Sequence, residues 1–158
     1  MSDARFEDSE ESALYLTAQD ADDLTVLSAL CQDAVFPITE MIWKSRQRQF
    51  AILLNRFRWE DREAAEREGR GFERVRAVLS VADVTKVSSL GIDQSDTDII
   101  LSVLSISFEA GADGTGRLVI TLAGDGAVSL EVECLDLTLR DVSQPYLAPS
   151  GKAPAHAL

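Results

Sequence analysis

Residues 99–141 read IILSVLSISFEAGADGTGRLVITLAGDGAVSLEVECLDLTLRD and contain the clearest β-sheet pattern of the chain. Branched and aromatic side chains, which favour strands, gather in residues 99–109, 117–123 and 127–141. The connections between these segments are GADGTG and GDG, and glycine and aspartate supply the positive φ values that tight hairpin turns require. The segment therefore predicts a series of antiparallel hairpins.

Two of the expected strands change phase along their length. In residues 127–141 the apolar positions shift parity between Cys134 and Leu135, and residues 72–92 lose their alternation near Ala82 and Asp83. A shift of one residue implies a β-bulge, or a strand that crosses from one layer to another. Such bent strands favour a curved sheet.

Residues 13–68 predict one amphipathic helix, one short exposed helix and three strands, two of which form a hairpin. Asp20 is placed to cap a helix in which Leu24, Leu27 and Cys31 recur at helical spacing. Strands are expected at residues 13–17, 35–43 and 49–59, with a short exposed helix at residues 60–68.

The predicted fold class is α+β, mainly antiparallel β. About seven strands would form a curved sheet, barrel or two-sheet sandwich with one packed amphipathic helix. Residues 1–12 are expected to be a disordered acidic tail, residues 13–143 a single α+β domain and residues 144–158 a C-terminal tail.

Composition favours a soluble cytoplasmic protein. The 158 residues are 46% hydrophobic and 27% charged, and the apolar runs fall far short of the about 20 residues that cross a bilayer. The N-terminus lacks the basic and apolar regions of a secretory signal. Cys31 and Cys134 are expected to be free thiols, each a small core residue on an apolar face.

Positive charge is concentrated in the middle of the chain. The net charge is −12, yet residues 44–86 hold eleven of the fifteen Lys and Arg side chains. Residues 43–59, here called the basic segment, contain five cations and no acid between two tryptophans. Tryptophan and arginine are enriched at interface hot spots. The predicted binding-surface residues are Trp43, Lys44, Arg46, Arg48, Arg56, Arg58 and Trp59.

No catalytic or cofactor motif is present. The single histidine, His156, lies near the C-terminus, and the chain contains no GxGxxG, GxxxxGK[ST], GxSxG or CxxC sequence. We therefore predict no catalytic residue, no cofactor and no metal site.

Four interpretations of the basic segment and the acidic residues follow. The leading functional one is a non-enzymatic protein-binding or adaptor module, which could self-associate by pairing the basic hairpin with acidic surface. A purely structural alternative is a solvated hairpin that balances acidic surface. Another alternative is single-stranded RNA binding, disfavoured by the net charge, with Trp43, Trp59, Phe50 or Phe57 as stacking platforms.

A carboxylate-dependent enzyme is the remaining alternative. Its candidate acids are Glu131 and Glu133 on one strand face, or the loop acids Asp93, Asp96 and Asp98. Such a site requires that these carboxylates converge in a pocket and that at least one of them has a strongly raised pKa.

Residues 55–59 contain polar side chains in an apolar strand. Asn55 is expected to be substantially buried and hydrogen-bonded to backbone; the rival interpretation is an amide that lines a ligand cleft with Arg56 or Arg58. The two arginines should mark the point where their face passes from core to solvent.

The motifs DADDLTVLSALCQDAV, ILLNRFRWE and GAVSLEVECLDLTLRDV resemble a family of small, uncharacterised bacterial cytoplasmic proteins, a conserved domain of unknown function. The resemblance spans residues 14–146. It implies no activity, cofactor or site residue, because the family has none assigned.

Overall fold

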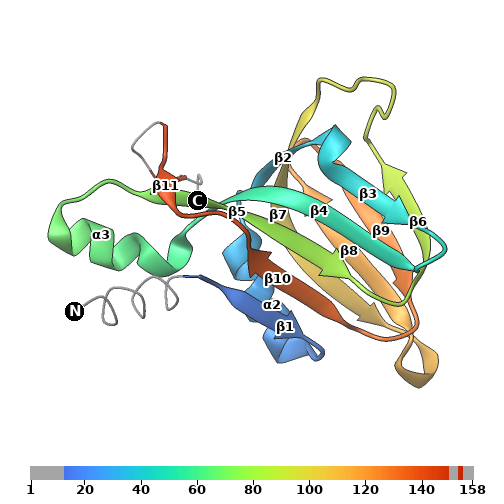
Figure 1. Ribbon diagram of the computed structural model, residues 1–158. Helices are drawn as coiled ribbons and strands as arrows, with labels where there is room; N and C mark the ends of the chain where they lie inside the picture. Colours follow the sequence, from blue (N-terminus) through green and yellow to red (C-terminus); the bar gives the residue numbers. More distant parts are fainter. Residues whose placement is uncertain (1–12, 150–152, 155–158) are drawn as a thin grey trace.

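The computed structural model describes residues 13–149 and 153–154, and within them the chain is dominated by β-structure (Figure 1). Eleven strands are present in these residues: β1 (Tyr15–Ala18), β2 (Val35–Pro37), β3 (Met41–Lys44), β4 (Gln49–Phe57), β5 (Glu73–Val81), β6 (Val84–Leu90), β7 (Ile100–Ala110), β8 (Gly116–Leu122), β9 (Ala127–Val132), β10 (Leu137–Asp141) and β11 (Tyr146–Leu147). The α-helices are α2 (Ala21–Cys31) and α3 (Arg62–Glu68), and the 3₁₀ helices are η1 (Ile38–Glu40), η2 (Trp59–Asp61) and η3 (Ala112–Gly114).

The strands form one open antiparallel sheet. Its order is β1-β10-β5-β4-β2-β7-β8-β9-β6, with β11 also paired to β5 and β3 also paired to β4. Every pairing is antiparallel, which confirms the predicted fold class. The sheet is curved, as expected, but it does not close into a barrel.

Eleven strands replace the expected seven because three expected strands are each divided in two. Residues 35–43 become β2 and β3, separated by η1 immediately after Pro37, which lacks a backbone N–H for the ladder. Residues 72–92 become β5 and β6 around Asp83, whose φ is 56°. Residues 127–141 become β9 and β10, divided where the apolar parity shifts, and β11 is additional.

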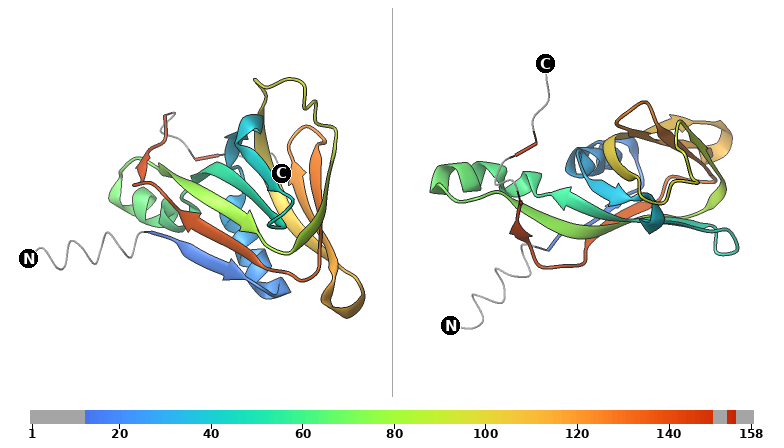
Figure 2. Two further views of the ribbon diagram at one scale, coloured as in Figure 1. Left: turned by 45° about the vertical axis from the view of Figure 1, so that its right-hand side comes forward. Right: turned by 90° about the horizontal axis from the view of Figure 1, so that it is seen from above.

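Curvature brings β6, at one end of the sheet, close to the turn between β3 and β4. The β4–β5–β10 part forms one layer, and α2 and β7–β9 lie behind it (Figure 2). At one corner the Val84 N–H donates to the Arg48 carbonyl at 2.8 Å, which joins the start of β6 to the β3–β4 turn. Beyond this bond the described parts of β3 and β6 have no strand partner on their facing edges.

Helix α2 fills the concave side of the sheet. Asp20 caps it by accepting a hydrogen bond from the Asp23 N–H at 2.8 Å, as predicted. Leu24, Leu27 and Cys31 are buried against the sheet, so the predicted apolar stripe is confirmed. Burial raises the pKa of the Cys31 thiol to about 12, against the weaker opposing effect of Arg56.

Helix α3 projects from one end of the molecule and ends at Gly69, whose φ of 65° is a left-handed C-cap (Figure 1). Beside it, β11 pairs Tyr146 with Arg74 of β5, so part of the expected C-terminal tail belongs to the sheet. Residues 1–12, expected to be a disordered tail, lie outside the described residues. No helix in the described ranges is both long and apolar enough to cross a membrane.

Candidate functional site

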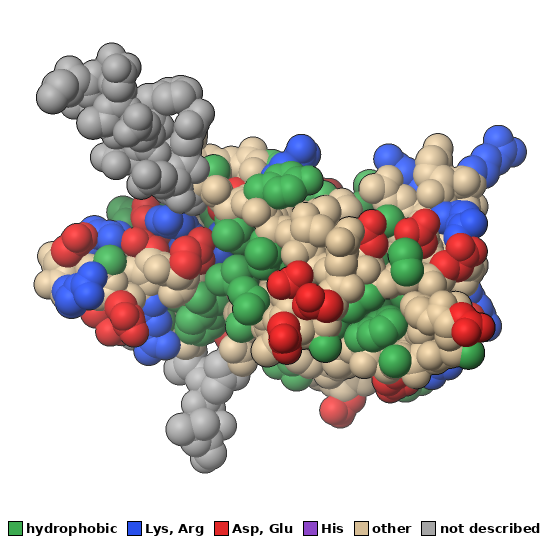
Figure 3. Space-filling model, turned by 90° about the horizontal axis from the view of Figure 1, so that it is seen from below, with side chains coloured by type: hydrophobic (Ala, Val, Ile, Leu, Met, Phe, Trp, Pro, Cys, Tyr) green, Lys and Arg blue, Asp and Glu red, His purple; other side chains and the backbone are tan. Residues whose placement is uncertain are grey.

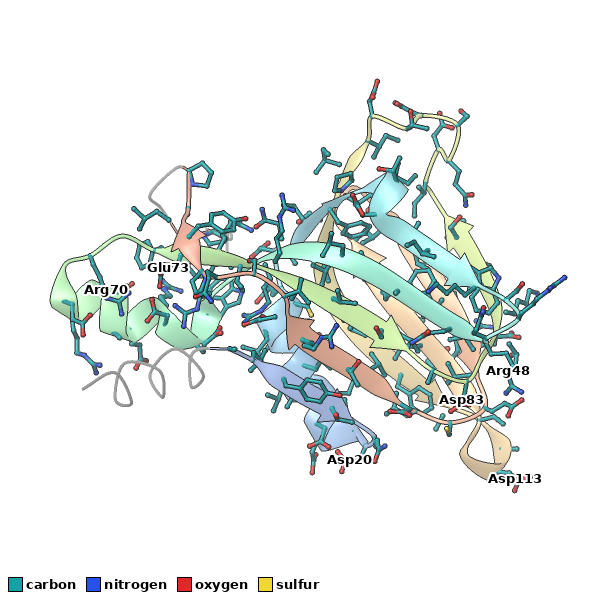
Figure 4. All side chains as sticks on the ribbon, in the orientation of Figure 1. Asp20, Arg48, Arg70, Glu73, Asp83 and Asp113 are labelled. Carbon is teal, nitrogen blue, oxygen red and sulfur yellow. The ribbon has the colours of Figure 1, made fainter. Side chains whose placement is uncertain are left out.

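The basic segment has two ends with different environments. Its first end is the β3–β4 hairpin, where Trp43, Lys44 and Arg46 are exposed. Its second end, residues 55–59, is followed by Glu60 in the sequence NRFRWE and runs from the last residues of β4 into η2, just before α3. Figure 4 shows Arg48 beside Asp83 at the hairpin end, far from Arg70 and Glu73 at the α3 end.

Arg56 is fully buried and is held by two carboxylates. Its Nε and Nη2 donate to the two oxygens of Asp141, both at 3.0 Å, and its Nη1 and Nη2 donate to those of Glu60 at 2.9 and 2.7 Å. Asp141 Oδ2 also accepts from the Leu14 N–H at 3.0 Å. The guanidinium thus joins the end of β4 to β10 and, through Leu14, to the segment entering β1.

The ionised forms of this cluster stabilise one another. Burial alone would lower the pKa of Arg56, but the hydrogen bonds to Glu60 and Asp141 outweigh it and raise that pKa. For Glu60, burial favours the neutral acid, but the hydrogen bond and charge of Arg56 outweigh it and lower the pKa. A hydrogen bond from Arg70 lowers the pKa of Asp61.

Arg58 lies in a second ion-pair cluster beside the first. Its Nη1 donates to Glu73 Oε1 at 2.5 Å and lies 3.6 Å from Asp61 Oδ2. Arg70 then binds Asp61 through both terminal nitrogens, each at 2.7 Å. Acidic and basic side chains are intermingled at the end of the molecule formed by α3 (Figure 3).

Trp59 links this end of the basic segment to the C-terminus of α2. Its Nε1 donates to the Gln32 carbonyl at 2.9 Å, just beyond the C-terminus of that helix. The Trp59 ring meets the buried Phe57 ring edge to face, with centroids 4.7 Å apart. The aromatic residues of this end therefore pack within the fold.

Two of the predicted surface residues are consequently not on the surface. Arg56 is 0% exposed and Arg58 9% exposed, whereas the expectation placed both where the strand enters solvent. The expectation was wrong because a buried charge is tolerated when it is paired and hydrogen-bonded, and the required carboxylates come from β10, η2 and β5. The outward-facing candidates are Trp43, Lys44, Arg46 and Arg48; their binding role stays a prediction.

At the hairpin end only one cation of the basic segment has a salt-bridge partner among the described residues. Arg48 pairs with Glu133, and the hydrogen bond that the guanidinium donates to this carboxylate raises the pKa of Arg48. Cys134 next to it is exposed, 3.1 Å from Asp83 Oδ2. Its expected place in the core was wrong because β9 ends at Val132, so the alternation of that strand no longer directs the next side chains inward.

A groove lies beside this hairpin, between β3 and β6. It has a volume of about 260 Å³, with Met41 and Trp43 on one wall, Val87 to Ser89 on the other, and Phe50 and Val128 among its lining. Phe50 is 1% exposed and Trp43 37% exposed. The Arg48–Val84 hydrogen bond lies beyond one end of the groove, and the loop containing Gln94 borders the other end.

The RNA interpretation loses several of its proposed contacts. Phe50 and Phe57 are buried, and the ring of Trp59 is partly buried. The guanidinium groups of Arg56 and Arg58 are occupied by carboxylates. The basic segment therefore offers one exposed tryptophan beside its exposed cations.

The candidate carboxylates are all exposed, although Glu131 and Glu133 line one open hollow together with Glu109 and Arg117. Glu131 and Glu133 are both exposed, with Arg117 3.8 Å from Glu131. Asp93 accepts hydrogen bonds from Ser95, which lower its pKa, the opposite of the shift that a general acid needs. No group of three His, Cys, Asp or Glu residues in the described part of the chain is placed to hold a metal ion.

Asn55 is half-buried but has no side-chain hydrogen bond, so the expected backbone partner is absent. Its Oδ1 is buried without a donor. The side chain lines a cleft, as the rival interpretation held, but with Arg76 of the neighbouring strand instead of Arg56 or Arg58. Successive side chains of a strand point to opposite faces, so with Arg56 directed into the core, Asn55 lies on the outer face of β4.

The fold and these surfaces define a class: an open, curved antiparallel sheet around one helix, with a groove between two free strand edges. Residues 14–156 match the model of a family described as protein of unknown function (DUF2948), and the chain belongs to this family. This match confirms the resemblance to a conserved domain of unknown function that the sequence motifs indicated. Searches of curated proteins and of solved structures found no match.

Proposed function

We propose that this domain is a protein-binding module that takes an extended peptide segment of a partner into the groove between β3 and β6. The observation that carries the proposal is the pair of free strand edges facing each other across an apolar floor. An unpaired edge presents N–H and C=O groups that an added strand can satisfy. An extended chain is the occupant that can pair with either edge.

The groove offers an anchor for one apolar side chain of that segment. Trp43, Phe50 and Val87 line it, and Trp43 has no side-chain hydrogen bond within the described residues. Tryptophan contributes strongly at interfaces because it buries a large area with few rotatable bonds. Trp43 is therefore the proposed centre of the contact.

Charge favours an acidic partner segment at the end of the groove near the Arg48–Val84 hydrogen bond. Lys44 ends β3, Lys86 lies near the start of β6, and Arg46 lies in the hairpin turn; all three are exposed. None of them has a salt bridge to a described residue. Complementary charge raises association rates and fixes orientation more than it adds affinity.

The test is selection of peptides from a displayed random library on the immobilised domain, followed by fluorescence polarisation with the selected peptides. We expect enrichment of segments that alternate apolar and polar residues and carry Asp or Glu. Trp43→Ala should weaken binding by about tenfold or more. Ile42→Ala is the matched control, because Ile42 is exposed and precedes Trp43 on the opposite face of β3; its affinity should not change.

Two outcomes would overturn the proposal. One is the absence of enriched peptides, or peptides that bind Trp43→Ala as tightly as the wild type. The other is concentration-dependent dimerisation in light scattering that Trp43→Ala abolishes, because the occupant would then be a second copy of this chain.

A further inference from the structure

A second cleft lies where β2 leaves β4. Strand β2 pairs with β4 only through Val35 and Asn55, and β3 pairs with residues 49–52 on the same edge of β4. Between these pairings the chain passes through η1, and a cleft of about 250 Å³ remains. It is separate from the β3–β6 groove, since the two share no lining residue.

Three polar side chains in this cleft have no partner among the described residues. Asn55 and Arg76 are directly opposite each other on β4 and β5, and Glu40 reaches the cleft from η1. The Oδ1 of Asn55 is buried without a donor, whereas its Nδ2, equally without a partner, is not buried. Arg76 and Glu40 are not ion-paired with each other or with any other described residue.

This arrangement contrasts with that of Arg56, whose terminal nitrogens all have acceptors. The unpaired guanidinium of Arg76 and the Asn55 Nδ2 form two neighbouring donors, which suit a carboxylate. Glu40 supplies a carboxylate, which suits an ammonium group. The remaining lining is largely apolar and includes Pro37 and Ile100, of which Ile100 is 61% exposed.

We propose that this cleft binds a free α-amino acid with an apolar side chain. The carboxylate of the ligand lies between Arg76 and Asn55, its ammonium group faces Glu40, and its side chain packs against Pro37 and Ile100. The volume of the cleft limits the ligand to about this size, at the low end of small-molecule sites. The ligand needs both charges, because the two unpaired protein charges are of opposite sign.

The experiment is a titration of ¹⁵N-labelled protein with L-leucine, followed by NMR. The expected result is saturable shifts that include the Asn55 side-chain amide. Leucinamide lacks the carboxylate and 4-methylpentanoate lacks the ammonium group, so each should bind about tenfold or more weakly than leucine.

Variants separate binding from folding. Arg76→Gln should weaken the affinity for leucine by about tenfold or more and leave the affinity for leucinamide unchanged. Glu40→Gln should remove the preference for leucine over 4-methylpentanoate. Arg140→Gln is the matched control, because Arg140 is an exposed arginine that does not line the cleft. Asn55→Leu should weaken leucine binding without lowering the melting temperature, since the amide has no protein partner to lose.

Several results would overturn this inference. They are the absence of saturable shifts with leucine, isoleucine, valine and methionine at about 10 mM, unchanged leucine affinity in Arg76→Gln, or a fall in melting temperature in Asn55→Leu without loss of binding. Trp43→Ala should leave leucine binding intact, so failure of the peptide proposal and failure of this one are distinguishable.

Discussion

At residues 43–48 the cations and the tryptophan of the basic segment reach solvent, whereas at residues 55–60 two arginines are buried and the tryptophan is hydrogen-bonded beside α2. Each end contains one tryptophan and two arginines. Their environments differ because acidic partners converge on one end: Glu60, Asp61, Glu73 and Asp141 surround Arg56 and Arg58. At the other end Arg48 has Glu133 alone.

Cations that are close in sequence therefore do not all belong to one exposed surface. The buried arginines hold strands and helices together through carboxylates of the same chain, and Arg56 has no donor left for a ligand. Those without carboxylate neighbours stay in solvent, where they are available to a partner. The three predictions below test this division, beginning with the largest effect.

Arg56→Ala should lower the free energy of unfolding by about 3 to 5 kcal/mol, because it leaves the buried Asp141 carboxylate without its main partner and opens a cavity. Arg46→Ala, at the exposed end, should leave that free energy unchanged within error. Urea denaturation followed by circular dichroism measures both. Equal effects of the two substitutions would contradict the division of the segment.

The free energy of unfolding should fall in acid because protonation of Glu60 weakens its pairing with Arg56. The pKa of Glu60 is below its ordinary value of 4.5 in the folded protein, so its contribution is fully present above pH 4.5 and is lost as pH falls through the folded pKa. Glu60→Gln should flatten the acid part of the stability profile, leaving the contribution of Asp61, whose pKa is also lowered. Glu63→Gln is the control, since Glu63 is exposed on α3; a profile identical to that of Glu60→Gln would contradict the assignment.

Trp59→Phe should lower the free energy of unfolding by about 1 kcal/mol, because phenylalanine keeps much of the packing but loses the hydrogen bond to the Gln32 carbonyl. Trp43→Phe has no such bond to lose and should change the stability less. Thermal unfolding of the two variants side by side measures the difference. A larger loss for Trp43→Phe would reverse the roles given to the two tryptophans.

The local patterns predicted the elements of the fold well where neighbours in sequence are also neighbours in space. Asp20 and the stripe containing Leu27 specify a capped helix within about a dozen residues. The GDG turn is likewise local, and Gly124 and Asp125 have the predicted positive φ values of 82° and 67°. The division of strands was harder to predict, because Pro37 and Asp83 interrupt strands whose pairing partners lie far along the chain.

The candidate sites depended on distant residues that no local pattern contains. Arg56 meets Asp141 across 85 positions. Alternation puts Arg56 on the same face as Leu54, and because no local pattern contains its partner, the charge of the arginine predicted that this face enters solvent there. Asn55 and Arg76 face each other only because β4 and β5 pair in one register, and their cleft exists only because η1 separates β2 from β3.

By itself, the sequence determined the antiparallel β-rich class, the capped amphipathic helix, the turns and the concentration of charge, since each depends on propensities and spacings of adjacent residues. Only the tertiary structure decided which arginines are buried, which strand edges stay free and which polar groups remain unpaired. The reason is physical: the free energy of a charge or a hydrogen-bonding group depends on the partners and solvent around it, and folding brings these together from distant parts of the chain.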